Sequence, residues 1–316
     1  MKVRPLITAV MVLALAASVG GQGPGAGGGP AAKVPITQTI NWNDIMFPTQ
    51  TQRVVPRDQE QKDPVKLFDN VYYVGVQTVS SYLITTSAGL ILIDTTFPDT
   101  VNLVLDHIRK VGFDPANIKY VFSTHAANDH YGGSGRIKQV VPGVRIGMSQ
   151  ADWETVEQDM PKLMAQPGNK MVAFSRDLVI SDGQTITLGD TTLKFYVLPG
   201  RTPGAIGIEY QARDRGKSYR AMSTGALGTP FSPKWDEPYI KSIARLKTLG
   251  PFQVWLPNHP FMVLPHDIAD IEKALATRGQ GPHPALVQPK VLNDYLDFIT
   301  ELIGRKMAID KYQGLI

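Results

Sequence analysis

The sequence contains no cysteine among its 316 residues. This absence excludes disulfides, thiolate zinc sites, iron–sulfur clusters and a cysteine nucleophile. A bound metal would have to be held by histidine and carboxylate side chains, and histidine is scarce too, with 6 residues. Charged residues make up 19% of the chain and hydrophobic residues 43%. This composition is typical of a folded protein with a sizeable core and excludes a disordered or collagen-like chain.

The N-terminus lacks an apolar run of the roughly 20 residues that a transmembrane helix needs. It has instead the order of a secretory signal peptide: Lys2 and Arg4, the apolar run Leu6–Ala17, and small residues between positions 18 and 21. We therefore expect residues 1–20 to be a signal peptide, and the missing cysteine excludes a lipoprotein anchor. The mature protein is then periplasmic or secreted, without a membrane anchor.

A strong excess of either charge is also missing. The formal charge of +4 falls to +2 when Lys2 and Arg4 are removed with the signal peptide. A nearly neutral chain gives no reason to expect nucleic acid as a partner. The sequence instead favours a small-molecule substrate, and it leaves the oligomeric state open.

Three regions follow from the pattern of residues. Residues 21–64 begin with a Gly/Pro/Ala tract and stay polar, so we expect a flexible leader and a loosely attached N-terminal arm. From residue 65 the chain twice runs through short β-rich segments followed by amphipathic helices. This order predicts an α/β fold, a four-layer αβ/βα sandwich, in a single domain over residues 65–316.

The chemistry is concentrated in the segment from Ser123 to Gly133, which follows a predicted buried strand. Asp129 and His130 lie in it, and His259 follows another predicted strand. Side chains at strand ends are held rigidly and still face a cleft. One carboxylate and two imidazoles would give zinc three ligands with a fourth position open, as in catalytic zinc sites. The alternative is that these histidines are hydrogen-bonded loop residues.

The stretch His125-Ala126-Ala127-Asn128-Asp129-His130 resembles the His-x-His-x-Asp-His motif of the metallo-β-lactamase superfamily. The resemblance extends over nearly all of the chain from Phe68 onward. It includes the strand ending in Asp94, the turn Gly200-Arg201-Thr202-Pro203-Gly204 and the last ligand in Asn258-His259-Pro260. Within the superfamily, the sequence is most similar to the third subclass of class B β-lactamases. The resemblance implies the four-layer fold and a zinc-dependent hydrolase.

The departures from the motif concern the first of the family's two metal sites. That site uses three histidines, of which this chain keeps His125 and has Ala127 and Arg201 at the other two positions. Alanine cannot bind a metal and a guanidinium repels one. The second site matches in full through Asp129, His130 and His259. We therefore expect one zinc per chain.

A single zinc could still lower the pKa of a bound water towards neutrality, and the resulting hydroxide would attack a carbonyl carbon. In this hypothesis Asp129 orients the hydroxide, His125 acts as general base and Arg201 stabilises the developing oxyanion. Alternatively, Arg201 pairs with Asp129 and blocks the site. Ser223 and Thr224 are expected, by family analogy, to bind a substrate carboxylate. We expect His107, on an exposed helix face, and His266 and His283 to lie outside the site.

The substrate remains open between three hypotheses. The family implies a cyclic amide, a β-lactam, hydrolysed by an exported zinc enzyme. The second hypothesis is a lactone or other ester, hydrolysed by the same fold. The third is a metal-poor protein that binds a ligand without catalysis. It stays open because fold alone does not determine function.

Overall fold

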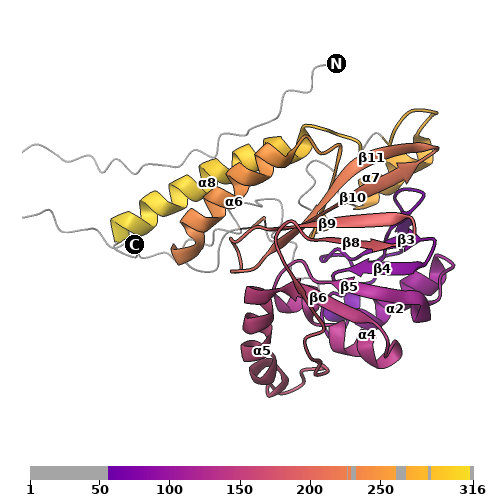
Figure 1. Cartoon of the computed structure of the whole chain (residues 1–316), viewed down its shortest axis with the longest axis horizontal. Coiled ribbons are helices and arrows are strands. Elements are labelled where there is room, and N and C mark those ends of the chain that lie inside the picture. Colours follow the sequence, from indigo (N-terminus) through magenta and orange to yellow (C-terminus); the bar gives the residue numbers. More distant parts are fainter. Residues whose placement is uncertain (1–55, 226, 229–232, 261–267, 284–285, 314–316) are drawn as a thin grey trace, which may run out of the picture. The chain divides into compact units, whose positions relative to one another are not determined.

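The structure is a computed structural model that describes residues 56–225, 227–228, 233–260, 268–283 and 286–313. The expected signal peptide and most of the expected leader lie outside these residues, as does His266. Within them, the chain forms two β-sheets that face each other, with helices on both outer sides (Figure 1). The predicted α/β sandwich is confirmed. The boundaries of the three predicted regions stay predictions.

The first sheet has seven strands that lie side by side in chain order. It is antiparallel from β1 to β4 and parallel from β4 to β7. Its strands are β1 (Val65–Lys66), β2 (Val71–Tyr73), β3 (Tyr82–Thr86), β4 (Gly89–Ile93), β5 (Ile118–Phe122), β6 (Arg145–Ser149) and β7 (Leu178–Ile180).

The second sheet has five strands in the order β12-β11-β10-β9-β8, and only the pair β11–β12 is parallel. Its strands are β8 (Thr185–Leu188), β9 (Thr191–Val197), β10 (Ile206–Asp214), β11 (Lys217–Thr224) and β12 (Val254–Pro257). The helices are α2 (Val101–Lys110), α3 (Asn128–Tyr131), α4 (Ser134–Val140), α5 (Gln150–Met164), α6 (Asp236–Leu249), α7 (Ile268–Thr277) and α8 (Val291–Gln313). Three short 3-10 helices complete the set: η2 (Arg57–Gln59), η3 (Pro115–Asn117) and η4 (Pro233–Trp235).

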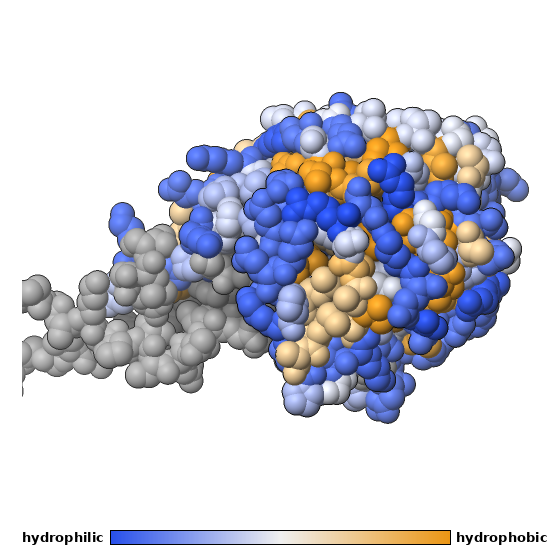
Figure 2. All heavy atoms as spheres, turned by 60° about the horizontal axis from the view of Figure 1, so that its bottom comes forward, coloured by the Kyte–Doolittle hydropathy of each residue, from blue (hydrophilic) through white to orange (hydrophobic). Residues whose placement is uncertain are grey.

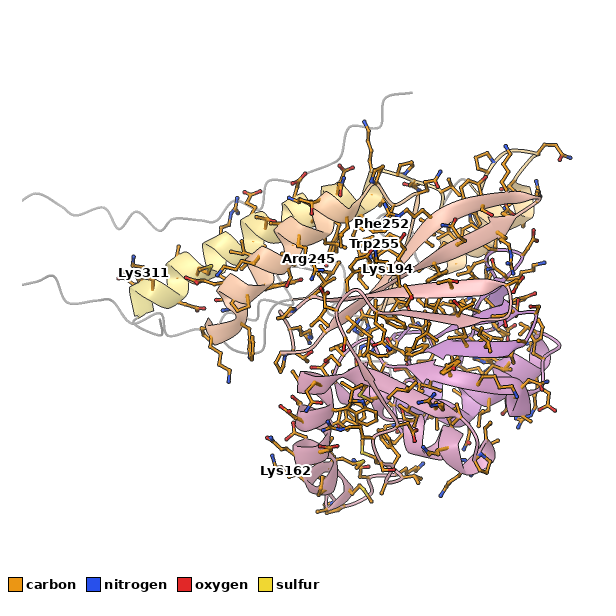
Figure 3. All side chains as sticks on the ribbon, viewed as in Figure 1. Lys162, Lys194, Arg245, Phe252, Trp255 and Lys311 are labelled. Carbon is orange, nitrogen blue, oxygen red and sulfur yellow. The ribbon has the colours of Figure 1, made fainter. Side chains whose placement is uncertain are left out.

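Three hydrophobic cores correspond to the three interfaces of a four-layer sandwich. Alternate residues of β4 show why: Ile91 and Ile93 enter the core between the sheets, whereas Leu90 and Leu92 enter the core beneath α2, α4 and α5. Successive side chains of a strand point to opposite faces, so a central strand of this fold must be apolar on both. The third core lies between the second sheet and the pair α6 and α8. Phe252 and Trp255 lie there, beside the two helices (Figure 3).

The surface reflects this distribution. On the face shown in Figure 2, hydrophilic residues cover most of the surface and hydrophobic ones gather in a few places between them. Among the described residues, four large hydrophobic side chains are exposed: Met164, Val179, Phe298 and Tyr312. No helix in this part of the chain is both long enough and apolar enough to cross a membrane.

Two findings differ from the sequence expectations. His107 is not on an exposed face but is buried, with its Nδ1 3.0 Å from the carbonyl oxygen of Val74. It borders the apolar stripe of α2, three residues after the buried Val104, so the stripe is wider than the apolar residues alone indicate. Glu60 is completely buried, although it lies in the segment expected to be loosely attached. His283 is also buried, against the ring of Phe68.

Candidate metal centre

The site lies where strands of both sheets end. His125 follows β5, the short helix α3 carries Asp129 and His130, and His259 follows β12. The main-chain N–H of Ile206 in β10 donates to the carbonyl oxygen of Thr124 over 2.8 Å. This bond joins the two sheets beside the site. The segments that carry His130 and His259, more than a hundred positions apart in the sequence, are therefore held next to each other.

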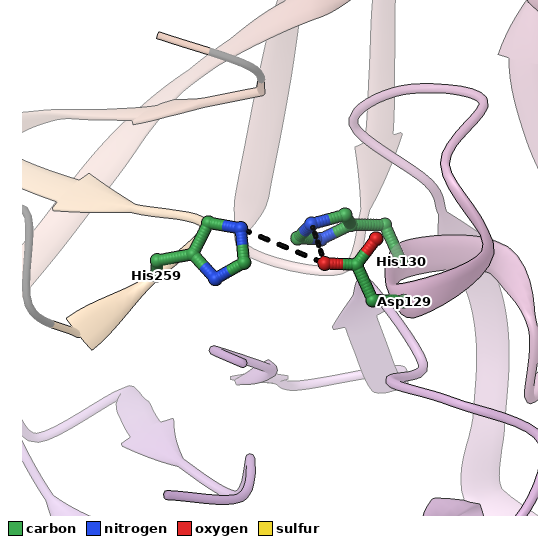
Figure 4. A group of neighbouring side chains, drawn as sticks. All are labelled: Asp129, His130 and His259. Atoms are coloured by element: carbon green, nitrogen blue, oxygen red, sulfur yellow. Dashed lines mark ion pairs between the residues drawn. The ribbon is translucent and has the colours of Figure 1, made fainter. Parts of the chain in front are cut away.

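The side chains of Asp129, His130 and His259 converge (Figure 4). Asp129 Oδ2 lies 3.1 Å from His130 Nε2 and 3.6 Å from His259 Nε2, and the three ligand atoms lie within 4.8 Å of one another. Zinc holds such ligands at about 2.0–2.2 Å, which sets neighbouring ligand atoms about 3.3 Å apart. The donor set fits zinc, and no other group of three such residues converges in the described ranges.

The ring nitrogen of each histidine that faces away from the cluster has an acceptor. His130 Nδ1 donates to Asp94 Oδ2 over 2.9 Å, and His259 Nδ1 donates to the carbonyl oxygen of Thr78 over 2.8 Å. In the neutral ring such bonds fix the tautomer, so that Nε2 is the nitrogen that can bind a metal. Asp94 has a positive φ of 59°, a strained conformation that persists where the surroundings hold it in place. The N–H and hydroxyl of Thr124 hold it here, donating to its two oxygens.

The two histidines of the cluster differ in protonation, because their pKa values are shifted in opposite directions. Burial alone would lower the pKa of His130, but Asp129 and Asp94 outweigh it and raise the pKa to about 9. Burial and the positive charge of His130 lower the pKa of His259 to about 3. Burial would raise the pKa of Asp129, whereas the histidines, His130 first, bring it below its ordinary range. Without metal, the cluster is an ion pair of Asp129 with His130 beside a neutral His259.

The residues of the altered first site lie next to this cluster. The rings of His125 and His130 are 4.2 Å apart between centroids. Burial, and then the charge of His130, lower the pKa of His125 well below its usual value, so His125 is neutral at pH 7. Burial also lowers the pKa of Arg201, while Asp129 acts in the opposite direction. Arg201 therefore lies within the electrostatic reach of Asp129, with its guanidinium packed against Gly228.

Asp152 is a residue of the site that the sequence analysis did not identify. Its carboxylate is buried and accepts the N–H of Ala126 at 2.9 Å, the hydroxyl of Thr202 at 2.9 Å and the N–H of Gly204 at 2.8 Å. It thus ties the segment carrying His125 to the turn carrying Arg201. A Cβ on Gly204 would lie 2.0 Å from Ser149 Oγ, so this close approach requires glycine. The only local signal is an acidic residue in the first turn of α5.

The two expected substrate-binding hydroxyls are buried and bonded within the protein. Ser223 Oγ lies 3.0 Å from Tyr210 Oη, and Thr224 Oγ1 accepts the indole N–H of Trp255 at 2.8 Å. These contacts give no support to a role in substrate binding, which stays a prediction.

Comparison with known proteins agrees with the fold of the chain. The family model described as "Metallo-beta-lactamase superfamily" matches residues 74–215. The solved structure of BJP-1, a subclass B3 metallo-beta-lactamase of Bradyrhizobium japonicum, is 27% identical with a TM-score of 0.70, over 82% of this chain and 98% of that one. Native FEZ-1 metallo-beta-lactamase from Legionella gormanii is 25% identical with a TM-score of 0.71, over 81% and 98% of the two chains.

Similar curated proteins match shorter stretches. The N-acyl homoserine lactonase AttM of Agrobacterium fabrum is 31% identical over 104 residues, which is 32% of this chain and 38% of that protein. The beta-lactamase-like protein 2 homolog of Caenorhabditis elegans is 24% identical over 58% of this chain and 56% of that protein. The chain thus matches less than two thirds of the length of these relatives. Residues 74–215 thus match the metallo-β-lactamase superfamily, and the fold of the chain is similar to that of subclass B3 enzymes.

Proposed function

We propose that the protein is an exported hydrolase with one zinc per chain, held by Asp129, His130 and His259, that opens a cyclic amide of the β-lactam class. The convergence of these three side chains, with the outer nitrogen of each histidine bonded to an acceptor, is the observation that carries the proposal. Zinc in such a site supplies Lewis acidity and lowers the pKa of a water molecule towards neutrality.

The residues around the cluster have distinct roles in this proposal. Asp129 orients the attacking water through its carboxylate. His125 is neutral and can accept a proton from it. Arg201 places a fixed positive charge where the family has its first metal, and there it stabilises the oxyanion that forms on the carbonyl oxygen. Asp152 keeps the segments of His125 and Arg201 in register.

The substrate class rests on the subclass B3 structures, which share both fold and at least a quarter of their residues with this chain. A lactone is the second candidate, because a named lactonase is 31% identical over 104 residues. The third candidate is a metal-poor binding protein, which the charge of Arg201 beside the cluster would favour.

Zinc content and substrate turnover separate these candidates. The purified chain should contain about one zinc, and the experiment measures its zinc content alongside turnover of a panel of β-lactams and lactones. Turnover of a β-lactam that is lost in His130→Ala supports the proposal, and turnover of lactones alone supports the second candidate. Well under one zinc per chain, with no activity after zinc is added, would contradict both.

The role of Arg201 has its own test. Arg201→Ala should lower turnover at least about 100-fold, the order of effect of losing one oxyanion donor, while zinc affinity changes little. Arg245→Ala is the matched control, because Arg245 forms a partly exposed pair with Asp182. An unchanged turnover in Arg201→Ala would contradict the catalytic role, and a higher turnover would show that Arg201 blocks the site.

A further inference from the structure

Glu60, in the arm before β1, binds one turn of the protein at three points. Its Oε2 accepts the N–H of Thr78 over 3.1 Å, and its Oε1 accepts the hydroxyl of Thr78 over 2.6 Å. Its main-chain carbonyl oxygen accepts the N–H of Gln77 over 3.0 Å. The side chain of Glu60 has no exposed surface. A buried carboxylate with two donors makes strong, charge-assisted bonds.

The same turn holds the segment that carries the third metal ligand. The carbonyl oxygen of Thr78 accepts His259 Nδ1–H over 2.8 Å, and the N–H of Ser80 donates to the carbonyl oxygen of Asn258 over 3.0 Å. Just beyond the turn, the hydroxyl of Tyr82 donates to the carbonyl oxygen of Pro257 over 2.7 Å. Thr78 therefore donates its N–H and hydroxyl to Glu60, and its carbonyl oxygen accepts the N–H of His259.

The bond to Thr78 determines which nitrogen of His259 carries the proton and how the ring is oriented. A neutral imidazole has one N–H, and the nitrogen that binds a metal must be the other one. Holding the N–H on Nδ1 keeps Nε2 unprotonated and able to bind a metal, on the side of Asp129. Thr78 is only partly buried. Without Glu60, water can therefore accept hydrogen bonds from the N–H and hydroxyl of Thr78, and the turn is no longer held by a buried carboxylate.

We propose that Glu60 is a positioning residue for His259, acting through the carbonyl group of Thr78. The arm before the first strand thereby belongs to the metal centre, although Glu60 touches neither metal nor substrate. This inference rests on the proposed zinc site in one respect, the effect on zinc affinity. The effect on the tautomer of His259 exists in the metal-free protein as well.

The alternative is that Glu60 only attaches the arm, and the chain offers a matched control. Lys62, two residues further on, binds Glu272 of α7 in a partly exposed ion pair. Glu272→Ala removes an attachment of the same arm by the same kind of substitution, away from Thr78. A loss of attachment alone would affect both variants alike.

The experiment compares the full-length chain with Glu60→Ala, Glu60→Gln and Glu272→Ala. Zinc affinity is measured by competition with a chromogenic chelator, and the tautomer of His259 by long-range 1H–15N spectra of the metal-free protein. Glu60→Ala should weaken zinc binding about 10-fold or more, as for other partners of metal ligands, and shift His259 from pure Nδ1–H to a mixture of tautomers. Glu60→Gln should stay within about threefold, because its amide can accept the N–H and donate to the hydroxyl oxygen of Thr78. Glu272→Ala should match the wild type.

The proposal is overturned if Glu60→Ala folds and keeps both zinc affinity and tautomer, or if Glu272→Ala changes them equally. Should Glu60→Ala not fold, Glu60→Asp gives the same test, because the shorter side chain cannot keep both bonds to Thr78. An unchanged zinc affinity and tautomer in Glu60→Asp would then overturn it. If the wild type binds no zinc, the proposed function fails, and the tautomer still decides the role of Glu60.

Discussion

At the scale of single residues, the carboxyl group of Asp152 makes the stability of the protein depend on pH. Burial raises its pKa to about 6, against the bonds from Thr202, Gly204 and Ala126. The folded state thus binds this proton more tightly than the unfolded state, so the contribution to stability is greatest below about pH 4 and falls as the pH rises through 6. Relative to Asp152→Asn, which does not titrate, the wild type should lose about 2 kcal/mol between about pH 4 and pH 7. Urea unfolding at both pH values measures this, and a constant difference would contradict it.

The hydroxyl of Tyr239 gives a second prediction at this scale. It is buried, and it has no hydrogen-bond partner in the described part of the chain. A buried donor without a partner costs about 1–3 kcal/mol. Tyr239→Phe should therefore leave the free energy of unfolding unchanged or raise it by up to about 1 kcal/mol. The matched control is Tyr210→Phe, which loses the bond to Ser223 and should cost about 1 kcal/mol. A loss of stability in Tyr239→Phe as large as in the control would show that this hydroxyl has a partner.

At the scale of elements, a buried ion cluster joins α6 to α8, which lie side by side (Figure 1). Lys306 of α8 is 2.9 Å from Asp236 of α6 and also binds Asp310, and all three residues are buried. Lys306→Met leaves two buried carboxylates without their cation and should lower the free energy of unfolding by about 3–5 kcal/mol. Lys247→Met breaks the more exposed pair with Asp297 between the same helices and should cost less than about 1 kcal/mol. Equal losses in chemical unfolding would refute this distinction.

The elements also show what a sequence can and cannot predict. The strands β4 and β5 and the helix α2 follow from their apolar patterns, because each pattern reports directly on the faces that the element buries. The residues of the cluster follow from their places after predicted strands and from the family motif. Glu60 and Asp152 do not, since their roles depend on contacts between distant segments. Asp152 meets Thr202 across 50 positions and His259 meets Thr78 across 181. No periodicity encodes such pairs.

At the scale of the whole molecule, the proposed metal ligands come from both halves of the sandwich. Asp129 and His130 follow the first sheet, and His259 follows the second. Zinc would therefore cross-link the two sheets at the edge where Ile206 already binds Thr124. A ligand that binds only the folded state stabilises it by an amount that grows with its affinity. Metal binding should thus be visible in the unfolding of the entire domain.

The pH dependence of this stabilisation follows from His130. Its pKa of about 9 lies above the ordinary 6.5, so in the metal-free protein its contribution to stability is complete below about pH 6.5 and is lost as the pH rises through 9. Zinc requires the deprotonated ring, so binding at pH 7 must release a proton. Zinc affinity should then rise about 10-fold per pH unit between about pH 6 and pH 8, and the added stability by about 1.4 kcal/mol per unit. Thermal unfolding with and without zinc measures both trends. His130→Ala should show no zinc effect at either pH, and a zinc-induced shift that is independent of pH in the wild type would contradict the release of a proton from His130.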